Sequence, residues 1–232
     1  DIRCKKILAA KKWAGLDHYK PIELKNLYKD LNNSNADLIN RQLTESSITL
    51  LSNKNDIIPL KGLDTLRIAS ISIGNKEIND FQNMLGYYAP VKNIVVDKDS
   101  RKEDIDSVLS RVKPYNLAIV NINNTNNDPK KDFGLTPEMV YLVKMLRRQT
   151  RVILNVFANP YILSKFEDAE KVDAAIMSYE YNKYTQNLSA QLIFGGIAAK
   201  GKLPVTASDK FKLGCGIETG QPIRFKYTVP EE

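Results

Sequence analysis

The sequence predicts an α/β fold: an open, doubly wound and mostly parallel sheet of about five or six strands with helices on both faces, flavodoxin-like in outline. Two observations predict it. From residue 66 onward, apolar runs of strand length alternate with amphipathic runs of helix length, which is typical of consecutive βαβ units. Several of the apolar runs lack regular polar alternation, as expected for strands that are covered on both faces. An N-terminal helical linker segment precedes this region.

The first sixty residues predict helices. We expect one helix over 1–14 that ends at Gly15, and a short helical stretch within 20–34. A third helix is predicted from Asp37, a residue type suited to capping, as far as Leu51. We place the domain boundary here, so that 1–44 form the helical linker and 45–232 form the α/β domain.

The following elements are expected in chain order after that segment. Strands are predicted over 66–73, 91–96, 117–122, 151–157 and 174–178. Helices are predicted over 76–85, 102–112, 136–148, 160–166 and 182–199. Pro137 suits the first turn of its helix, where a missing N–H costs nothing. The tail from 201 is rich in glycine, and its last apolar run, 224–229, is a candidate edge strand.

Composition excludes several classes of protein. The hydrophobic fraction of 43% and the charged fraction of 26% are those of an ordinary globular protein. The net charge is +7, but eight Lys or Arg stand against four Asp or Glu in residues 1–30 alone. We therefore expect a charged helix surface rather than a nucleic-acid site. No apolar run reaches the roughly 20 residues of a membrane span. The chain opens with Asp1 rather than Met, and we expect it to be part of a longer protein. The sequence leaves the compartment of that protein open: periplasmic or secreted is slightly favoured, and cytoplasmic stays an alternative.

The motifs for metals and cofactors are absent or broken. Cys4 and Cys215 lie far apart and His18 is the one histidine, so we predict no metal site, and two free thiols rather than a single bridge. Residues 196–202 resemble a P-loop, but Leu203 replaces the magnesium-binding Ser or Thr, and the run ends a helix instead of opening one. Gly74 lacks the further glycines of a dinucleotide fingerprint. No cofactor is predicted.

Ligands of open α/β sheets bind at the carboxyl ends of the strands, and the loop after the third strand of the βαβ region is unusually polar. Residues 121–134 are dominated by asparagine, whose amide offers both donors and an acceptor to sugar hydroxyls; asparagine also suits plain turns. Asn124, Asn127, Asp128 and Glu180 are the predicted substrate-binding residues. Asp128 and Asp132 are the candidates for a catalytic carboxylate, although neither has an obvious partner in the chain.

Several stretches resemble the C-terminal domain of glycoside hydrolase family 3, in the right order and over nearly the whole chain. They are the opening run Lys6–Leu16, the run Glu45–Leu60 with its Glu-Ser…Thr-Leu-Leu pattern, the helix start Leu135-Thr136-Pro137-Glu138, the strand end Phe157-Ala158-Asn159-Pro160, and the most specific one, Phe194-Gly195-Gly196 followed by Gly201-Lys202-Leu203-Pro204-Val205-Thr206.

This resemblance implies an exo-acting enzyme that cleaves β-linked sugars with retention, through an aspartate nucleophile on an N-terminal barrel domain. In the β-glucosidase branch, the acid/base glutamate lies in the loop after the third strand. Residues 121–134 contain no glutamate, so the resemblance favours the bacterial β-N-acetylglucosaminidase branch, where a barrel histidine takes that role. This chain would then hold no catalytic residue, and its partners would be the barrel and a carbohydrate.

Three alternatives remain open at this stage. A β-glucosidase or β-xylosidase would need Asp128 or Asp132 in place of the glutamate. A non-catalytic sugar-binding or scaffold domain would bind saccharides by itself. An unrelated flavodoxin-like regulatory domain is disfavoured by the lack of a phosphate loop. The last residues, 224–232, resemble the linker ahead of a β-lactamase-like domain in some bacterial fusions, which adds a possible downstream partner.

Overall fold

The structure is a computed structural model that describes residues 1–230, apart from the side chains at 167 and 168. The chain divides into two compact units, Asp1–Leu38 and Ile39–Glu232. The first unit holds α1 (Ile2–Trp13), a 3₁₀ turn (Leu16–His18), α2 (Leu27–Leu31) and the start of α3 (Ser34–Ser47). None of its residues is buried. Cys4 in this unit and Cys215 in the second are free thiols.

The second unit is an α/β fold with a six-stranded sheet, which confirms the predicted fold class. The strands are β1 (Thr49–Asn53), β2 (Ile68–Ile73), β3 (Val91–Val96), β4 (Leu117–Ile122), β5 (Arg151–Val156) and β6 (Ala174–Met177). Their order in the sheet is β1-β6-β5-β4-β2-β3. Five strands are parallel to one another, and β1 pairs antiparallel with β6 at one edge.

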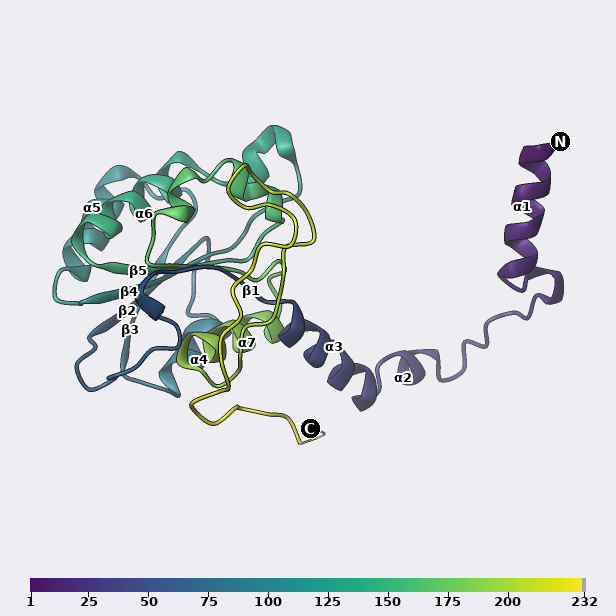
Figure 1. Cartoon of the computed structure of the whole chain (residues 1–232), viewed down its shortest axis with the longest axis horizontal. Coiled ribbons are helices and arrows are strands. Elements are labelled where there is room, and N and C mark those ends of the chain that lie inside the picture. The colour runs from purple at the N-terminus through teal and green to yellow at the C-terminus, as the bar shows by residue number, and fades with distance from the viewer. Residues whose placement is uncertain (231–232) are drawn as a thin grey trace. The chain divides into compact units, whose positions relative to one another are not determined.

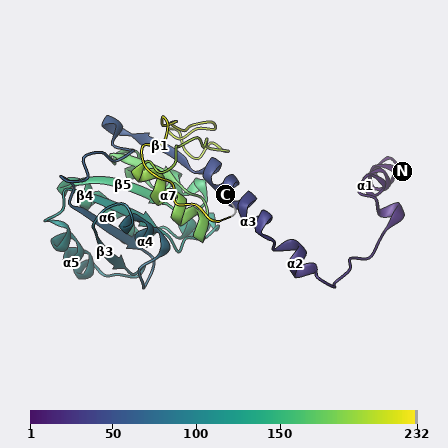
Figure 2. The ribbon, with the colours of Figure 1, turned by 90° about the horizontal axis from the view of Figure 1, so that it is seen from below.

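Helices cover both faces of the sheet (Figure 1). The pair α5 (Lys102–Val112) and α6 (Pro137–Gln149) covers one face, where Val108 and Leu142 belong to one buried cluster with Val120. The pair α4 (Asp80–Gly86) and α7 (Lys183–Phe194) covers the other face. Figure 2 is seen from that side and shows α4 and α7 next to each other across the sheet.

Three expected elements differ from the structure. The helix predicted to end at Leu51 ends at Ser47 instead, because Thr49–Asn53 pairs with β6 and buries Thr49 and Leu50. The helix predicted over 182–199 ends at Phe194, since Gly195 adopts a left-handed conformation at its C-cap. Residues 224–229 form no strand.

Two shorter differences concern local helix type. The segment predicted as a helix over 160–166 is a 3₁₀ turn, Pro160–Ser164. Two more 3₁₀ turns, Pro129–Gly134 and Glu167–Glu170, belong to the loops at the ends of β4 and β5. Helical segments of this kind stay short because side chains at i and i+3 eclipse each other and the hydrogen-bond geometry is poorer than in an α-helix. No helix in the described residues is long and apolar enough to cross a membrane.

Candidate functional site

The five parallel strands end along one edge of the sheet, and this carboxyl edge is where an open α/β sheet binds ligands. Counted without β1, the order β3-β2-β4-β5-β6 is that of the flavodoxin-like fold, and the chain reverses direction across the sheet between β2 and β4. That switch point is the first place to look for a site.

A buried cluster of polar side chains closes the switch point. Asn121 Oδ1 accepts hydrogen bonds from Ser72 Oγ at 3.0 Å, from Asn123 Nδ2 at 3.0 Å and from Asn79 Nδ2 at 3.3 Å. Both amide groups also donate to Ser72 Oγ, at 3.1 Å each. All four side chains are at most 8% exposed. These hydrogen bonds join the ends of β2 and β4 and close the switch point, although Asn123 Oδ1 is buried without a hydrogen-bond partner among the described residues.

Gly74 completes this closure directly after β2. Its φ of 105° suits glycine, and a Cβ atom at this position would lie 2.5 Å from the carbonyl oxygen of Asn123. The backbones that leave β2 and β4 thus touch above the amide cluster. The residues that follow Gly74 line a second pocket, which is described below.

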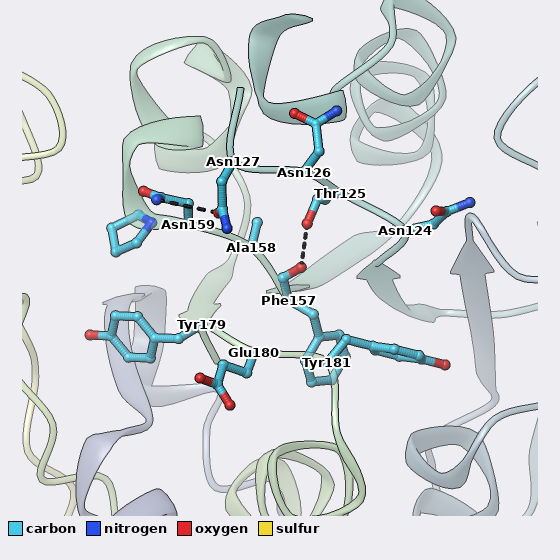
Figure 3. Close-up of a pocket in the computed structure, with 11 residues that line it drawn as sticks. Asn124, Thr125, Asn126, Asn127, Phe157, Ala158, Asn159, Tyr179, Glu180 and Tyr181 are labelled. Atoms are coloured by element: carbon cyan, nitrogen blue, oxygen red, sulfur yellow. Dashed lines mark hydrogen bonds between the residues drawn. The ribbon is translucent and has the colours of Figure 1, made fainter. Parts of the chain in front are cut away.

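A pocket of about 490 Å³ lies beside the switch point, at the ends of β4, β5 and β6 (Figure 3). A volume of this size is within the range of small-molecule sites. Its walls come from three loops, and its lining residues are Asn124, Thr125, Asn126, Asn127, Phe157, Ala158, Asn159, Pro160, Tyr179, Glu180 and Tyr181.

Amide side chains from two loops form one wall of the pocket. Asn159 Nδ2 donates to Asn127 Oδ1 at 3.5 Å, and Figure 3 shows these two side chains facing each other while Asn124 points away from Asn127. Thr125 Oγ1 donates to the carbonyl oxygen of Phe157 at 2.9 Å and ties the loops together. Asn124 has a φ of 55°, which asparagine tolerates better than most residues. Asn124 and Asn127 are exposed, so both amides are open to a ligand.

A tight turn after β6 supplies the one carboxylate of the lining. Glu180 N donates to the carbonyl oxygen of Ser178 at 2.8 Å, which closes a three-residue turn around Tyr179, whose φ is 62°. Tyr179 Oη and Thr49 Oγ1 lie 2.7 Å apart, so the turn is fixed to β1. Burial raises the pKa of Tyr179, and the hydrogen bond with Thr49 opposes that rise.

Glu180 itself is exposed and held from the side. Its Oε2 atom accepts a hydrogen bond from Asn182 Nδ2 at 3.1 Å, and its carbonyl oxygen accepts one from Thr185 Oγ1 at 2.7 Å. Asn182 also caps α7 through its side chain. Such a carboxylate is fixed in position, and its second oxygen can still accept a hydrogen bond from a hydroxyl group of a ligand.

A second pocket of about 420 Å³ adjoins the first on the β2 side. Its lining residues are Asn75, Lys76, Glu77, Ile78, Asn79, Asp80, Tyr181 and Gln186. Tyr181 lines both pockets. Nowhere in the described part of the chain do three His, Cys, Asp or Glu side chains come together as metal ligands would.

Comparison with known proteins identifies the family. Residues 48–222 match the Glycosyl hydrolase family 3 C-terminal domain. The chain belongs to this family. A candidate beta-xylosidase of Formosa agariphila is 21% identical to it, over 89% of this chain and 31% of that protein.

Solved structures show the same fold. A family 3 beta-N-acetylglucosaminidase from Paenibacillus sp. str. FPU-7 has a TM-score of 0.62 at 16% identity, and the match covers 88% of this chain and 39% of that one. A fungal multi-domain family 3 beta-N-acetylglucosaminidase has a TM-score of 0.61 at 19% identity, over 82% of this chain and 21% of that one. The chain thus spans well under half of each of these proteins.

The most family-like motif of this family 3 domain has a packing role. A Cβ atom on Gly201 would lie 2.2 Å from the carbonyl oxygen of Ser47 and 2.5 Å from that of Ile48, so the Gly-Lys-Leu-Pro-Val-Thr run packs directly on the segment that leads into β1. Asn159 and Thr136, from two other family-like motifs, accept hydrogen bonds from backbone N–H groups at helix starts. The motifs that reveal the family therefore build its fold.

The structure brings together three of the predicted site residues and not the other two. Asn124, Asn127 and Glu180 line the first pocket. Asp128 lies outside the lining and accepts a hydrogen bond from the backbone N of Lys130 at 2.9 Å. Asp132 also lies outside it, 3.1 Å from Lys165 Nζ and 56% exposed.

The sequence analysis named Asn159 only within a family-like motif, and it did not single out Tyr179 or Tyr181, which follow the predicted strand 174–178. An aromatic residue that directly follows a strand of a parallel sheet was the available signal.

Proposed function

We propose that this family 3 domain is the second domain of a retaining, exo-acting β-N-acetylglucosaminidase, whose nucleophile and acid/base group lie on an N-terminal barrel domain. The observation that carries this proposal concerns the acidic residues of the loop after β4. That loop holds no glutamate, and its two aspartates are engaged in a turn and in a surface ion pair outside the pocket.

The chemistry of retention supports placing the catalytic groups elsewhere. A retaining glycosidase needs two carboxyl groups, or an equivalent pair, about 5–5.5 Å apart across the scissile bond. Glu180 is the one carboxylate among the residues that line the first pocket. A single exposed carboxylate supplies one hydrogen-bond acceptor for a sugar, and it lacks the partner that bond cleavage requires.

In this proposal the first pocket contributes binding contacts. The amides of Asn124 and Asn127 would donate to and accept from sugar hydroxyls or an N-acetyl group, and the carboxylate of Glu180 would accept from a pair of hydroxyls. The exposed apolar side chains of residues 1–38, such as Trp13 at 90% exposure, also favour a neighbouring domain that covers them.

A β-xylosidase or β-glucosidase is the second candidate, and the similarity to a candidate beta-xylosidase favours it. On this alternative, Asp128 or Asp132 would have to leave its present partner and serve as the acid. Each partner contact would be lost on that movement, which makes this the less favoured assignment.

Hydrolysis by the full-length protein tests the proposal. Aryl β-N-acetylglucosaminide, β-glucoside and β-xyloside are offered to the full-length protein and to chain 1–232 by itself. We expect the full-length protein to prefer the N-acetylglucosaminide, and chain 1–232 to hydrolyse none of them. A preference for the glucoside or xyloside would favour the second candidate, and turnover by chain 1–232 would refute the assignment of the catalytic groups.

Two variants make this test sharper. Asp128→Asn and Asp132→Asn in the full-length protein should each leave kcat/KM within about threefold, because neither carboxylate lines the pocket. Loss of a general acid typically costs about 10²–10⁴ in rate. A loss of that size in either variant would identify the acid and contradict the proposal.

A further inference from the structure

Tyr181 stands between the two pockets of the carboxyl edge. Its side chain lines both the pocket of about 490 Å³ and the pocket of about 420 Å³. The residue is 41% exposed, so part of its ring is open to solvent at the point where the pockets meet. In Figure 3 the ring extends away from Glu180, on the side of the pocket where Asn124 lies.

The ring of Tyr181 is fixed at both ends. Its hydroxyl oxygen accepts a hydrogen bond from Asn75 Nδ2 at 2.5 Å, which joins the loop after β6 to the loop after β2. The ring packs edge-on against Phe157, with centroids 5.4 Å apart and planes at 76°. Phe157 is 1% exposed and packs in turn on Phe81 at 5.8 Å. Because these contacts hold the ring in one orientation, a ligand would lose little side-chain entropy when it stacks there.

The second pocket offers polar groups beyond the ring. Gln186 is 6% exposed and lines this pocket, and its Oε1 atom accepts from the backbone N of Phe81 at 3.4 Å. The Nε2 group of the same amide can donate a hydrogen bond to a ligand oxygen in the pocket.

We propose that the two pockets form one saccharide groove and that Tyr181 is its stacking platform, with one sugar unit on each side. The C–H bonds on the face of a pyranose ring carry partial positive charge and meet the negative face of the aromatic ring. The amides of Asn124 and Asn127 form hydrogen bonds with the first sugar unit, and the amide of Gln186 forms one with the second. The ligand class is therefore a β-linked disaccharide or a longer chain.

This inference rests on the proposed function, which supplies the sugar, and it adds a second subsite and a specificity-determining residue. Binding measured on chain 1–232 needs no catalytic group, whereas the proposed function is tested by hydrolysis. If the full-length protein hydrolyses its substrate but disaccharide binding does not depend on Tyr181, only the groove proposal is refuted. If chain 1–232 binds the disaccharide but the full-length protein does not hydrolyse the N-acetylglucosaminide, only the proposed function is refuted.

The experiment is a calorimetric titration of chain 1–232 with N-acetylglucosamine and with its β-1,4-linked disaccharide. We expect the disaccharide to bind more tightly than the monosaccharide, and Tyr181→Ala to weaken disaccharide binding by about five- to tenfold. Tyr181→Phe keeps the ring and should weaken it by less than about threefold. Tyr161→Ala is the matched control, since Tyr161 is 45% exposed, stacks on Phe133 and lines neither pocket.

Two results would overturn the groove. One is equal disaccharide affinity in the wild type and in a folded Tyr181→Ala variant. The other is a wild-type protein that binds no disaccharide. If Tyr181→Ala does not fold, nuclear Overhauser contacts between the disaccharide and the Tyr181 ring in the wild type decide the matter. Contacts to both sugar units support the proposal, and contacts to neither unit reject it.

Discussion

The buried amide cluster at the switch point gives the sharpest test of the fold, through the substitution Asn121→Leu. Leucine has the same number of side-chain heavy atoms as asparagine, with the same branching, so the change removes hydrogen bonds without leaving a cavity. Three hydrogen bonds end on Asn121 Oδ1, at 3.0, 3.0 and 3.3 Å. At about 0.5–1.5 kcal/mol for each bond, we expect the free energy of unfolding to fall by roughly 2–4 kcal/mol.

Other hydrogen bonds in the cluster limit this loss of stability. The amides of Asn79 and Asn123 keep a second acceptor in Ser72 Oγ at 3.1 Å, and the Ser72 hydroxyl loses Asn121 Oδ1, the acceptor that it now uses. Ser72→Ala in the Asn121→Leu background removes both acceptors at once. The double variant should therefore lose more than the sum of the two single variants, by about 1 kcal/mol or more.

Urea unfolding of chain 1–232, followed by circular dichroism, measures these free energies. A fall of roughly 3 kcal/mol corresponds to a decrease in Tm of roughly 6–12 °C for a chain of this size. Asn127→Leu is the matched control, because it makes the same substitution at an exposed position of the loop that follows β4 and should cost less than about 0.5 kcal/mol. A cost below about 1 kcal/mol for Asn121→Leu, or simple additivity in the double variant, would refute the account of the cluster.

Two further predictions concern packing and pH. Gly201→Ala should lower the free energy of unfolding by about 1–3 kcal/mol or more, since its Cβ would lie 2.2 Å from Ser47 O; Gly220→Ala, with nothing within 4 Å, should be neutral in the same urea assay. Burial, with a contribution from Tyr227, raises the pKa of Tyr88 from 10.0 to about 12. Stability should therefore fall as pH rises from about 10 through about 12, and Tyr88→Phe should flatten that fall when melts are recorded across this range.

The central elements of the fold were predicted well, because each of them is determined by residues within its own segment. The strand 91–96, the helix 102–112 and the strand 117–122 have the predicted bounds, since hydrophobic periodicity inside each segment decides them. The strand β1 was missed because Thr49–Asn53 becomes a strand only by pairing with β6, which is distant in the chain. The helical spacing that predicted a helix over 37–51 gave no sign of that partner.

The position of the candidate site could be predicted from the sequence, but the full set of residues that line it could not. The carboxyl-edge rule led to Asn124, Asn127 and Glu180, because strand ends can be read from the sequence. It could not separate them from Asp128, whose carboxylate turns back to the N–H group of Lys130. It also could not identify Tyr181, whose placement depends on Asn75 and on loops that meet only after folding.

The same residue type serves two opposite purposes within this short stretch. Asn121 and Asn123 face inward at 0% exposure and satisfy their neighbours, whereas Asn124 and Asn127 are exposed beside the pocket. The transition comes one residue after the end of β4 at Ile122, because Asn123 N still donates to the carbonyl oxygen of Ile73 at 3.1 Å and the chain leaves the sheet at Asn124. Because inward amides hold the sheet closed and outward amides are free for hydroxyl groups, stability and ligand affinity should respond to different asparagines. The closed switch point thereby moves the ligand surface toward β5 and β6, where Glu180 and Tyr181 lie.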